Sequence, residues 1–231
     1  TTEIYTLSLH DALPIYQREV TARRRSPISD FGEGLRFIRR EKRIILTLIL
    51  LGLIPNVVLH QVWFLLPVFT ADVLHREADV GGFLLSATGV GGFASSVIIA
   101  SIGFTFKKGP VALASILASS IFVILFALSP WLLPTYPLLP ALILIGLMSM
   151  AQSHYRTTAG TLIQLSTPDR FRSRVTSLAS YGQGFVFPFS ILVGIFAELS
   201  GAITAIIVLG LIGLVLSTFF TIRLGDVRRE P

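Results

Sequence analysis

The chain has 231 residues, of which 52% are hydrophobic and only 14% charged, and its mean hydropathy is +0.75. Soluble domains carry about 25% charged residues, so this composition excludes an ordinary soluble fold and indicates a membrane protein. A net charge of +6 would suggest nucleic-acid binding in a soluble chain, but here the basic residues lie between apolar runs, where they set membrane topology.

Residues 1–15, TTEIYTLSLHDALPI, match the translation of a common short-read sequencing adapter at every position. They also show no helical or strand periodicity. We therefore expect an adapter-derived artefact here and leave this stretch out of the fold and the function. The same origin implies a reading frame that was entered within a gene, so we expect a fragment without its natural N-terminus.

Residues 16–43 are the expected cytoplasmic linker, and they contain a short amphipathic helix. Phe31, Leu35 and Ile38 recur at i, i+4 and i+7 among several arginines. This pattern is typical of a basic helix that lies on the inner leaflet of a membrane. A solvated, charged linker is the alternative.

Six apolar runs follow, within an expected transmembrane half-domain at 44–223. Each has roughly the 20 residues that cross about 30 Å of hydrocarbon at 1.5 Å per residue. No strand pattern of alternating hydrophobicity is present in the sequence, so helices are the only plausible spanning form. The expected fold class is an all-α membrane protein with six transmembrane helices. These helices are expected at residues 44–70, 80–104, 110–129, 138–165, 175–198 and 202–223.

Lysine and arginine set the orientation of the spans. Basic residues precede the first span and follow the second, fourth and sixth, and they are nearly absent from the other connections. This positive-inside pattern predicts that both ends of the chain, including a tail at 224–231, are cytoplasmic in a cell (inner) membrane. Of the 19 lysines and arginines, only Arg156 falls in the interior of a span, since Arg223 is the last residue of the sixth.

The second span is rich in small residues. Gly92, Ser96 and Ala100 recur at every fourth position, with Gly89 and Gly91 beside them. Because small residues at this spacing let helix backbones approach closely, we expect this face to pack against another helix.

The second and fifth spans contain similar glycine-rich stretches: TGVG at 88–91 and YGQG at 181–184. The two stretches occupy equivalent positions if the six spans form two groups of three that enter the membrane from opposite sides. This arrangement, a 3+3 inverted repeat, occurs within each six-helix half of major facilitator transporters.

The stretch YRTTAGTLIQLSTPDRFRSRVTSL, residues 155–178, resembles the major facilitator subgroup that includes the enterobactin exporter. The likeness is carried by a T-L-x-Q run, a P-D/E-x-x-R-G-R-V loop and a Ser-Leu helix start. Ser173 replaces the usual glycine of that loop. FGEGLRFIRREKRI is similar to the segment before the seventh helix of the subgroup. The residues of the expected cytoplasmic loop motif are Pro168, Asp169, Arg172 and Arg174.

The resemblance covers about residues 30–225 and implies the C-terminal half of a twelve-helix secondary transporter. The implied partners are the lipid bilayer, a missing N-terminal six-helix half and a small-molecule substrate. No nucleic acid, cofactor or metal is implied. The subgroup implies export of a small molecule such as a drug or a siderophore by alternating access, although fold-level likeness does not fix function.

Polar residues inside lipid are expensive, which makes them candidate functional residues. The fourth span holds most of them, and at 100° per residue many fall on one stripe with Arg156. We expect this stripe to face a substrate path, where Arg156 attracts an anionic group or pairs with a carboxylate of the missing half. The alternative is an arginine that snorkels or pairs with a backbone carbonyl. The stripe comprises Ser149, Gln152, Ser153, Arg156, Gly160 and Gln164.

In the first span, Asn56, His60, Trp63 and Pro67 share a face at i, i+4, i+7 and i+11. Pro55 is expected to open the helix beside them, and broken helices near the middle of the membrane are common at transporter sites. This face is therefore a second part of the expected substrate path. An ordinary kink with a polar filler is the alternative.

No Asp or Glu lies deep in any of the six expected spans. His60 and His154 are the possible proton-linked residues, because only histidine titrates near neutral pH without perturbation. His154 points away from the Arg156 stripe, and a hydrogen-bonded packing role is its alternative. Tyr181 and Gln183 of the fifth span complete the expected substrate path.

Two other interpretations stay open. A self-sufficient six-helix carrier or scaffold that works as a dimer predicts a start codon just upstream of the first span. An intramembrane enzyme would need a motif such as GxSG or HExxH, or paired intramembrane aspartates. The sequence contains none of these, and we expect no enzyme.

Overall fold

The computed structural model describes residues 43–102, 108–180 and 184–223, which are almost entirely helical and contain no strand. The expected amphipathic helix before the first span and the tail at 224–231 lie outside these ranges. Five of the described helices are long and apolar enough to cross a membrane. The predicted fold class, an all-α membrane protein, is confirmed.

The first span is one helical rod built from four segments. Two of the segments are π-helical, and each lies beside a proline: Pro55 is in the first, and Pro67 comes two residues before the second. Proline lacks an N–H and its ring clashes with the preceding turn, and the wider π turn accommodates both effects. At Pro55 the helix therefore widens rather than opening fully. The segments are α2 (Arg43–Leu53), η1 (Ile54–Leu59), α3 (Gln61–Val68) and η2 (Phe69–Val73).

Seven further helices follow the first span. The expected second, third, fourth and sixth spans correspond to α4, α5, α7 and α10, with ends that differ by a few residues. α6 is a single turn in the connection after α5. The bounds are α4 (Ala78–Ile102), α5 (Lys108–Ala127), α6 (Ser129–Leu132), α7 (Leu138–Ser166), α8 (Asp169–Ser180), α9 (Val186–Ser200) and α10 (Ala202–Arg223).

The prediction of one continuous span at 175–198 was wrong. Residues 175–180 form the C-terminal half of α8, whose sequence DRFRSRVTSLAS carries its three arginines before residue 175. The apolar part forms α9, which has 15 residues and therefore covers only about 22 Å at 1.5 Å per residue.

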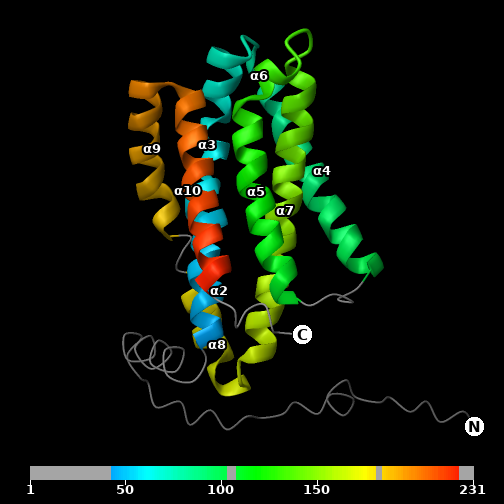
Figure 1. Cartoon of the computed structure of the whole chain (residues 1–231), viewed down its shortest axis with the longest axis vertical. Coiled ribbons are helices and arrows are strands. Elements are labelled where there is room, and N and C mark those ends of the chain that lie inside the picture. The colour runs from blue at the N-terminus through cyan, green and yellow to red at the C-terminus, as the bar shows by residue number, and fades with distance from the viewer. Residues whose placement is uncertain (1–42, 103–107, 181–183, 224–231) are drawn as a thin grey trace, which may run out of the picture.

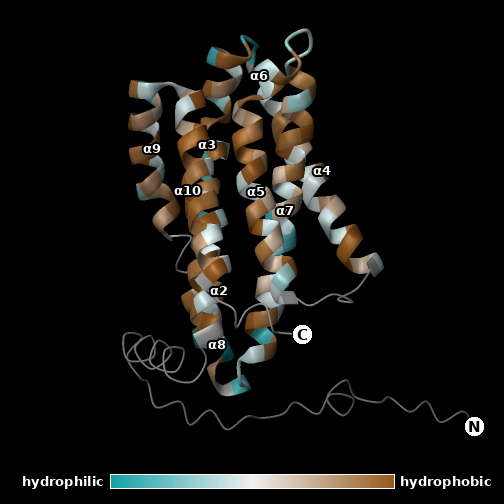
Figure 2. Cartoon of the chain, in the orientation of Figure 1, coloured by the Kyte–Doolittle hydropathy of each residue, from teal (hydrophilic) through white to brown (hydrophobic). Residues whose placement is uncertain are grey.

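The long helices stand side by side in one bundle, with α6 at one end and α8 at the other (Figure 1). α7 packs against both α4 and α5, α5 also packs against α10, and α9 lies against α10 and α3. Toward its C-terminal end, α4 leans away from the bundle (Figure 1). Apolar residues cover most of α5, α9 and α10, whereas polar residues are more frequent on the lower part of α7 and on α8 (Figure 2).

The closest helix crossing joins α4 to α7 through two glycines. A Cβ added at Gly91 would lie 2.0 Å from the carbonyl oxygen of Gly146, so no larger residue fits there without a shift. Ser95, one turn further along α4, is fully buried, whereas Ser96 and Ala100 are exposed. The packed face of α4 therefore lies one residue earlier than the predicted repeat of small residues.

We predict that Gly91→Val lowers the melting temperature of the purified chain in detergent by about 5 °C, because overpacking costs about 1–3 kcal/mol. Size-exclusion chromatography after heating measures the folded fraction that remains. Gly89→Val is the matched control, since nothing lies within 4 Å of a Cβ at Gly89. An equal decrease in melting temperature for the two variants would show that the α4–α7 contact is not made as described.

Candidate functional site

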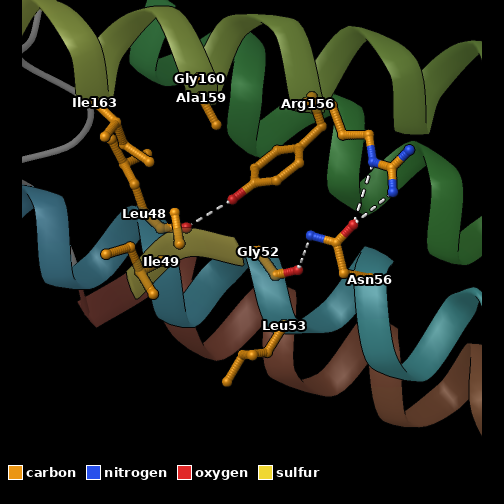
Figure 3. Close-up of a pocket in the computed structure, with 11 residues that line it drawn as sticks. Leu48, Ile49, Gly52, Leu53, Asn56, Arg156, Ala159, Gly160 and Ile163 are labelled. Carbon is orange, nitrogen blue, oxygen red and sulfur yellow. Dashed lines mark hydrogen bonds between the residues drawn. The ribbon is translucent and has the colours of Figure 1, made fainter. Parts of the chain in front are cut away.

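A pocket of about 130 Å³ lies between the first span, α7 and α8 (Figure 3). Its walls are mostly apolar, and its polar side chains are Asn56, Tyr155 and Arg156. Pockets that enclose a drug-sized ligand measure about 300–1,000 Å³. This pocket is therefore large enough for one group of a ligand, or for one wall of a wider path.

Arg156 on α7 reaches across the pocket to Asn56 in η1. Its Nε and Nη2 both donate to Asn56 Oδ1, at 3.2 and 2.9 Å (Figure 3). The amide oxygen is neutral, so this bond leaves the guanidinium charge uncompensated. Within the described ranges, the salt bridge that the structure shows joins Arg172 to Asp169, and none involves Arg156. Arg156 is also exposed, so its charge is available to an anionic partner.

The local sequence of η1 holds Asn56 in place. In a π-helix each N–H bonds to the carbonyl five residues before it, which shifts the usual pairing by one position. The Asn56 side chain supplies a donor to a carbonyl of the preceding turn: its Nδ2 donates to Gly52 O at 2.8 Å. The amide nitrogen of Asn56 thus donates to a carbonyl of its own helix, and the amide oxygen accepts hydrogen bonds from α7.

Tyr155 forms a second link between the same elements. It is 2% exposed, and its hydroxyl donates to Leu48 O at 2.9 Å (Figure 3). We did not single out this residue from the sequence. The signal was present, since a tyrosine in the middle of a span must find a partner for its O–H.

Only some residues of the predicted Arg156 stripe line the pocket. Ser149 is buried against α4, where its hydroxyl donates to Thr88 O at 2.8 Å. Ser153 also faces α4, since a Cβ at Gly92 would lie 3.4 Å from Ser153 Oγ. Arg156 and Gly160 are the stripe residues that line the pocket, and the substrate-path role of the stripe stays a prediction.

Two glutamines of the predicted stripe differ in their surroundings. Gln152 is 7% exposed, and its Nε2 has no hydrogen-bond partner within the part of the chain that the structure describes. Gln164 is exposed near the α8 end of α7. Neither lines the pocket.

The two histidines lie in different environments. His154 Nδ1 is 3.4 Å from Ser95 Oγ of α4, so His154 turns away from the Arg156 pocket, as its place on the helix predicts. The His60 ring stacks on the Trp63 ring with centroids 5.3 Å apart. His60 and Trp63 therefore continue the Asn56 face along the first span.

Gln61 is a functional candidate that the sequence reasoning missed. It is fully buried, and its Nε2 donates to Val57 O at 2.9 Å and to Val186 O at 3.1 Å. The second bond joins the first span to the start of α9. A glutamine inside an apolar run is the signal that could have identified it.

The predicted cytoplasmic loop motif is helical over most of its length. Pro168 precedes α8, and the residues from Asp169 onward lie in that helix. Arg172 Nη2 and Asp169 Oδ1 are 2.8 Å apart, one helical turn from each other. The Arg174 guanidinium lies 5.9 Å from the centre of the Phe171 ring. Tyr181 and Gln183 lie outside the described residues.

Apolar helices that cross a membrane several times, with an uncompensated arginine at a pocket between two of them, define a multi-pass membrane protein of the transporter class. The sequence profile of the Major Facilitator Superfamily matches residues 12–187, which is more than half of the chain. The chain belongs to this superfamily, whose members are membrane transporters. No curated protein and no solved structure matches the chain.

We predict that Asn56→Leu and Arg156→Leu are coupled in stability by about 1–2 kcal/mol, because each removes the same charge-assisted hydrogen bond. Unfolding of the single and double variants in mixed detergent and dodecyl sulfate micelles measures the coupling. Asn56→Leu combined with Ser115→Ala is the control pair, since Ser115 bonds within α5 to Val111 O. Coupling no larger than in the control pair would contradict the Asn56–Arg156 bond.

Proposed function

We propose that this chain supplies the substrate-binding wall of a secondary transporter that exports a small molecule by alternating access. It works with a second six-helix half that completes the path. The orientation follows the positive-inside pattern, with α8 and both ends of the chain on the cytoplasmic side. The observation that carries the proposal is the Arg156–Asn56 pair at the pocket between the first span and α7.

The free-energy cost of a charge in lipid supports the placement of Arg156 at a substrate path. A charged side chain in the middle of a bilayer is tolerated when it faces a bundle interior or a water-filled cavity. Arg156 is exposed on this chain and bonds to a neutral amide, so it needs a cavity or a second bundle beside it. A pocket of about 130 Å³ does not enclose a substrate, and an opposing six-helix unit supplies the rest of the enclosure.

The bond also suggests how a substrate drives the cycle. An anionic group of the substrate competes with Asn56 Oδ1 for the guanidinium of Arg156. Loss of the Asn56 bond releases the first span from α7 at η1, where the π turn already departs from the α-helical pattern. A ligand shifts an equilibrium between two states only by the difference in its affinity for them. Here an anion binds more tightly to the state in which Arg156 is released from Asn56, because the guanidinium is then free to bond to the anion.

Few groups of this chain are candidates for proton coupling. His60 lies on the Asn56 face and is a candidate, while His154 turns toward α4 and is a weaker one. The six expected spans hold no deep Asp or Glu, so a coupling carboxylate has to come from the partner half.

Efflux from exporter-deficient cells tests the proposal. The chain is co-expressed with the N-terminal half recovered from its gene, and the efflux of enterobactin and of ethidium is measured. We expect Arg156→Gln to lower the efflux of the transported compound at least about tenfold, because a charge-assisted hydrogen bond contributes about 1.5–3 kcal/mol. Arg156→Lys should recover part of the activity, since it keeps the charge.

Thr157→Ala is the matched control, since Thr157 is exposed beside Arg156 and its hydroxyl bonds within α7 to Ser153 O. Full activity of Arg156→Gln would contradict the role of Arg156. Equal efflux from the chain expressed alone would favour a self-sufficient six-helix carrier that acts as a dimer.

A further inference from the structure

A second pocket, of about 310 Å³, lies between the first span and the start of α4. The start of α4, which contributes Gly81 and Gly82 to the lining, lies toward the end of the bundle opposite α8 (Figure 1). No residue lines both this pocket and the Arg156 pocket. Its volume is at the lower end of the range for pockets that hold small molecules.

The larger part of the lining is apolar. Leu66, Pro67, Ala71 and Leu85 line the pocket together with Trp63. Trp63 presents a large planar surface, and its other neighbour is the His60 ring, stacked with centroids 5.3 Å apart. These walls suit an apolar, flat body such as an aromatic ring system.

The polar side chains of the lining favour an acceptor in the ligand. Arg76 carries a guanidinium, which only donates hydrogen bonds. The buried Trp63 Nε1, also donor-only, has no partner within the ranges that the structure describes. Thr70 already donates its hydroxyl to Leu66 O at 2.8 Å. A ligand that complements this set presents hydrogen-bond acceptors and a negative charge.

The charge of Arg76 is not neutralised nearby. Glu77 and Asp79 are close in sequence, but the structure shows no salt bridge from Arg76 to either within the described part of the chain. Asp79 Oδ1 instead accepts a hydrogen bond from the backbone N–H of Val80 at 2.8 Å. The Arg76 guanidinium is therefore open to an anion from outside the chain.

We propose that this pocket binds an amphiphilic organic anion. The apolar, planar body of the ligand packs on Trp63, Pro67 and Leu85, and its carboxylate or similar acidic group bonds to Arg76. The pocket shares no lining residue with the Arg156 pocket, although Trp63 and Pro67 also belong to the face of the first span that is predicted to line the substrate path. Occupancy is an equilibrium property that does not require transport.

Energy transfer from Trp63 tests the proposal. The chain has two tryptophans, and Trp131→Phe leaves Trp63 as the single donor. The probes are dansylglycine, dansylamide and dansylcadaverine, which share one fluorophore and are anionic, neutral and cationic. They are titrated onto the full chain in phosphatidylcholine nanodiscs. We expect a dissociation constant for dansylglycine at least about tenfold below those of the other two probes, the size of one charge-assisted hydrogen bond.

Arg76→Gln should raise the dissociation constant of dansylglycine about tenfold and leave that of dansylamide within about twofold. Arg228→Gln removes the same charge from the C-terminal tail and should change neither value. Equal affinities for the three probes, or an unaltered affinity in Arg76→Gln, would overturn the proposal. Because efflux is not measured, failure of the transport proposal leaves this result standing.

The acidic group can come from a free solute or from a lipid headgroup, and a second series of nanodiscs separates these sources. Phosphatidylglycerol replaces part of the phosphatidylcholine. A dissociation constant for dansylglycine that rises with the phosphatidylglycerol fraction more steeply than in Arg76→Gln, which reports only the repulsion of the probe by the anionic bilayer, identifies a lipid as the occupant. An equal rise in the two proteins identifies a free solute, and both results retain the anion site at Arg76.

Discussion

A polar group without a hydrogen-bond partner is costly inside a bilayer, and this cost explains many contacts of the described first span and α7. Side-chain amides and hydroxyls on the first span and α7 bond to backbone carbonyls as well as to one another. Asn56 bonds to Gly52 O, Gln61 to Val57 O and Val186 O, and Tyr155 to Leu48 O. The Tyr155 bond joins the first span to α7, and the Gln61 bond to Val186 O joins it to α9.

For Arg156, hydrogen bonding within the described chain is not enough to compensate the side chain. Its hydrogen bonds to Asn56 satisfy part of the guanidinium without neutralising its charge. The proposed role of Arg156 in substrate binding rests on this uncompensated charge, since a fully paired arginine would have nothing to offer an incoming anion. The π segment that carries Asn56 is the neighbouring element that already departs from regular helix, so a change at Arg156 acts on the first span where it is least regular.

The sequence predicted the membrane class and five of the spans well, because a run of about 20 apolar residues has few alternatives. It failed at 175–198, where an average over the window hid the boundary between an arginine-rich helix and a short apolar one. Asn56 and Arg156 were both named as candidates, but their bond was not predicted. A helical wheel gives no distance between two helices, and its 100° step does not apply across a π turn. The contact face of α4 was misplaced by one residue for a related reason: several small residues are adjacent, and only the crossing with Gly146 selects Gly91.

The central claim is that the Arg156 face opens to water rather than to lipid, and cysteine accessibility tests it directly. The chain has no cysteine, and nothing lies within 4 Å of a Cβ at Gly160, so Gly160→Cys places a single thiol at the pocket. Val215→Cys, on an exposed face of α10, is the comparison. A charged methanethiosulfonate reacts with thiolates that water reaches. We expect the cysteine at position 160 to react at least about tenfold faster than that at 215, which corresponds to about 1.4 kcal/mol of barrier height. Equal, slow reaction at both positions would contradict the central claim.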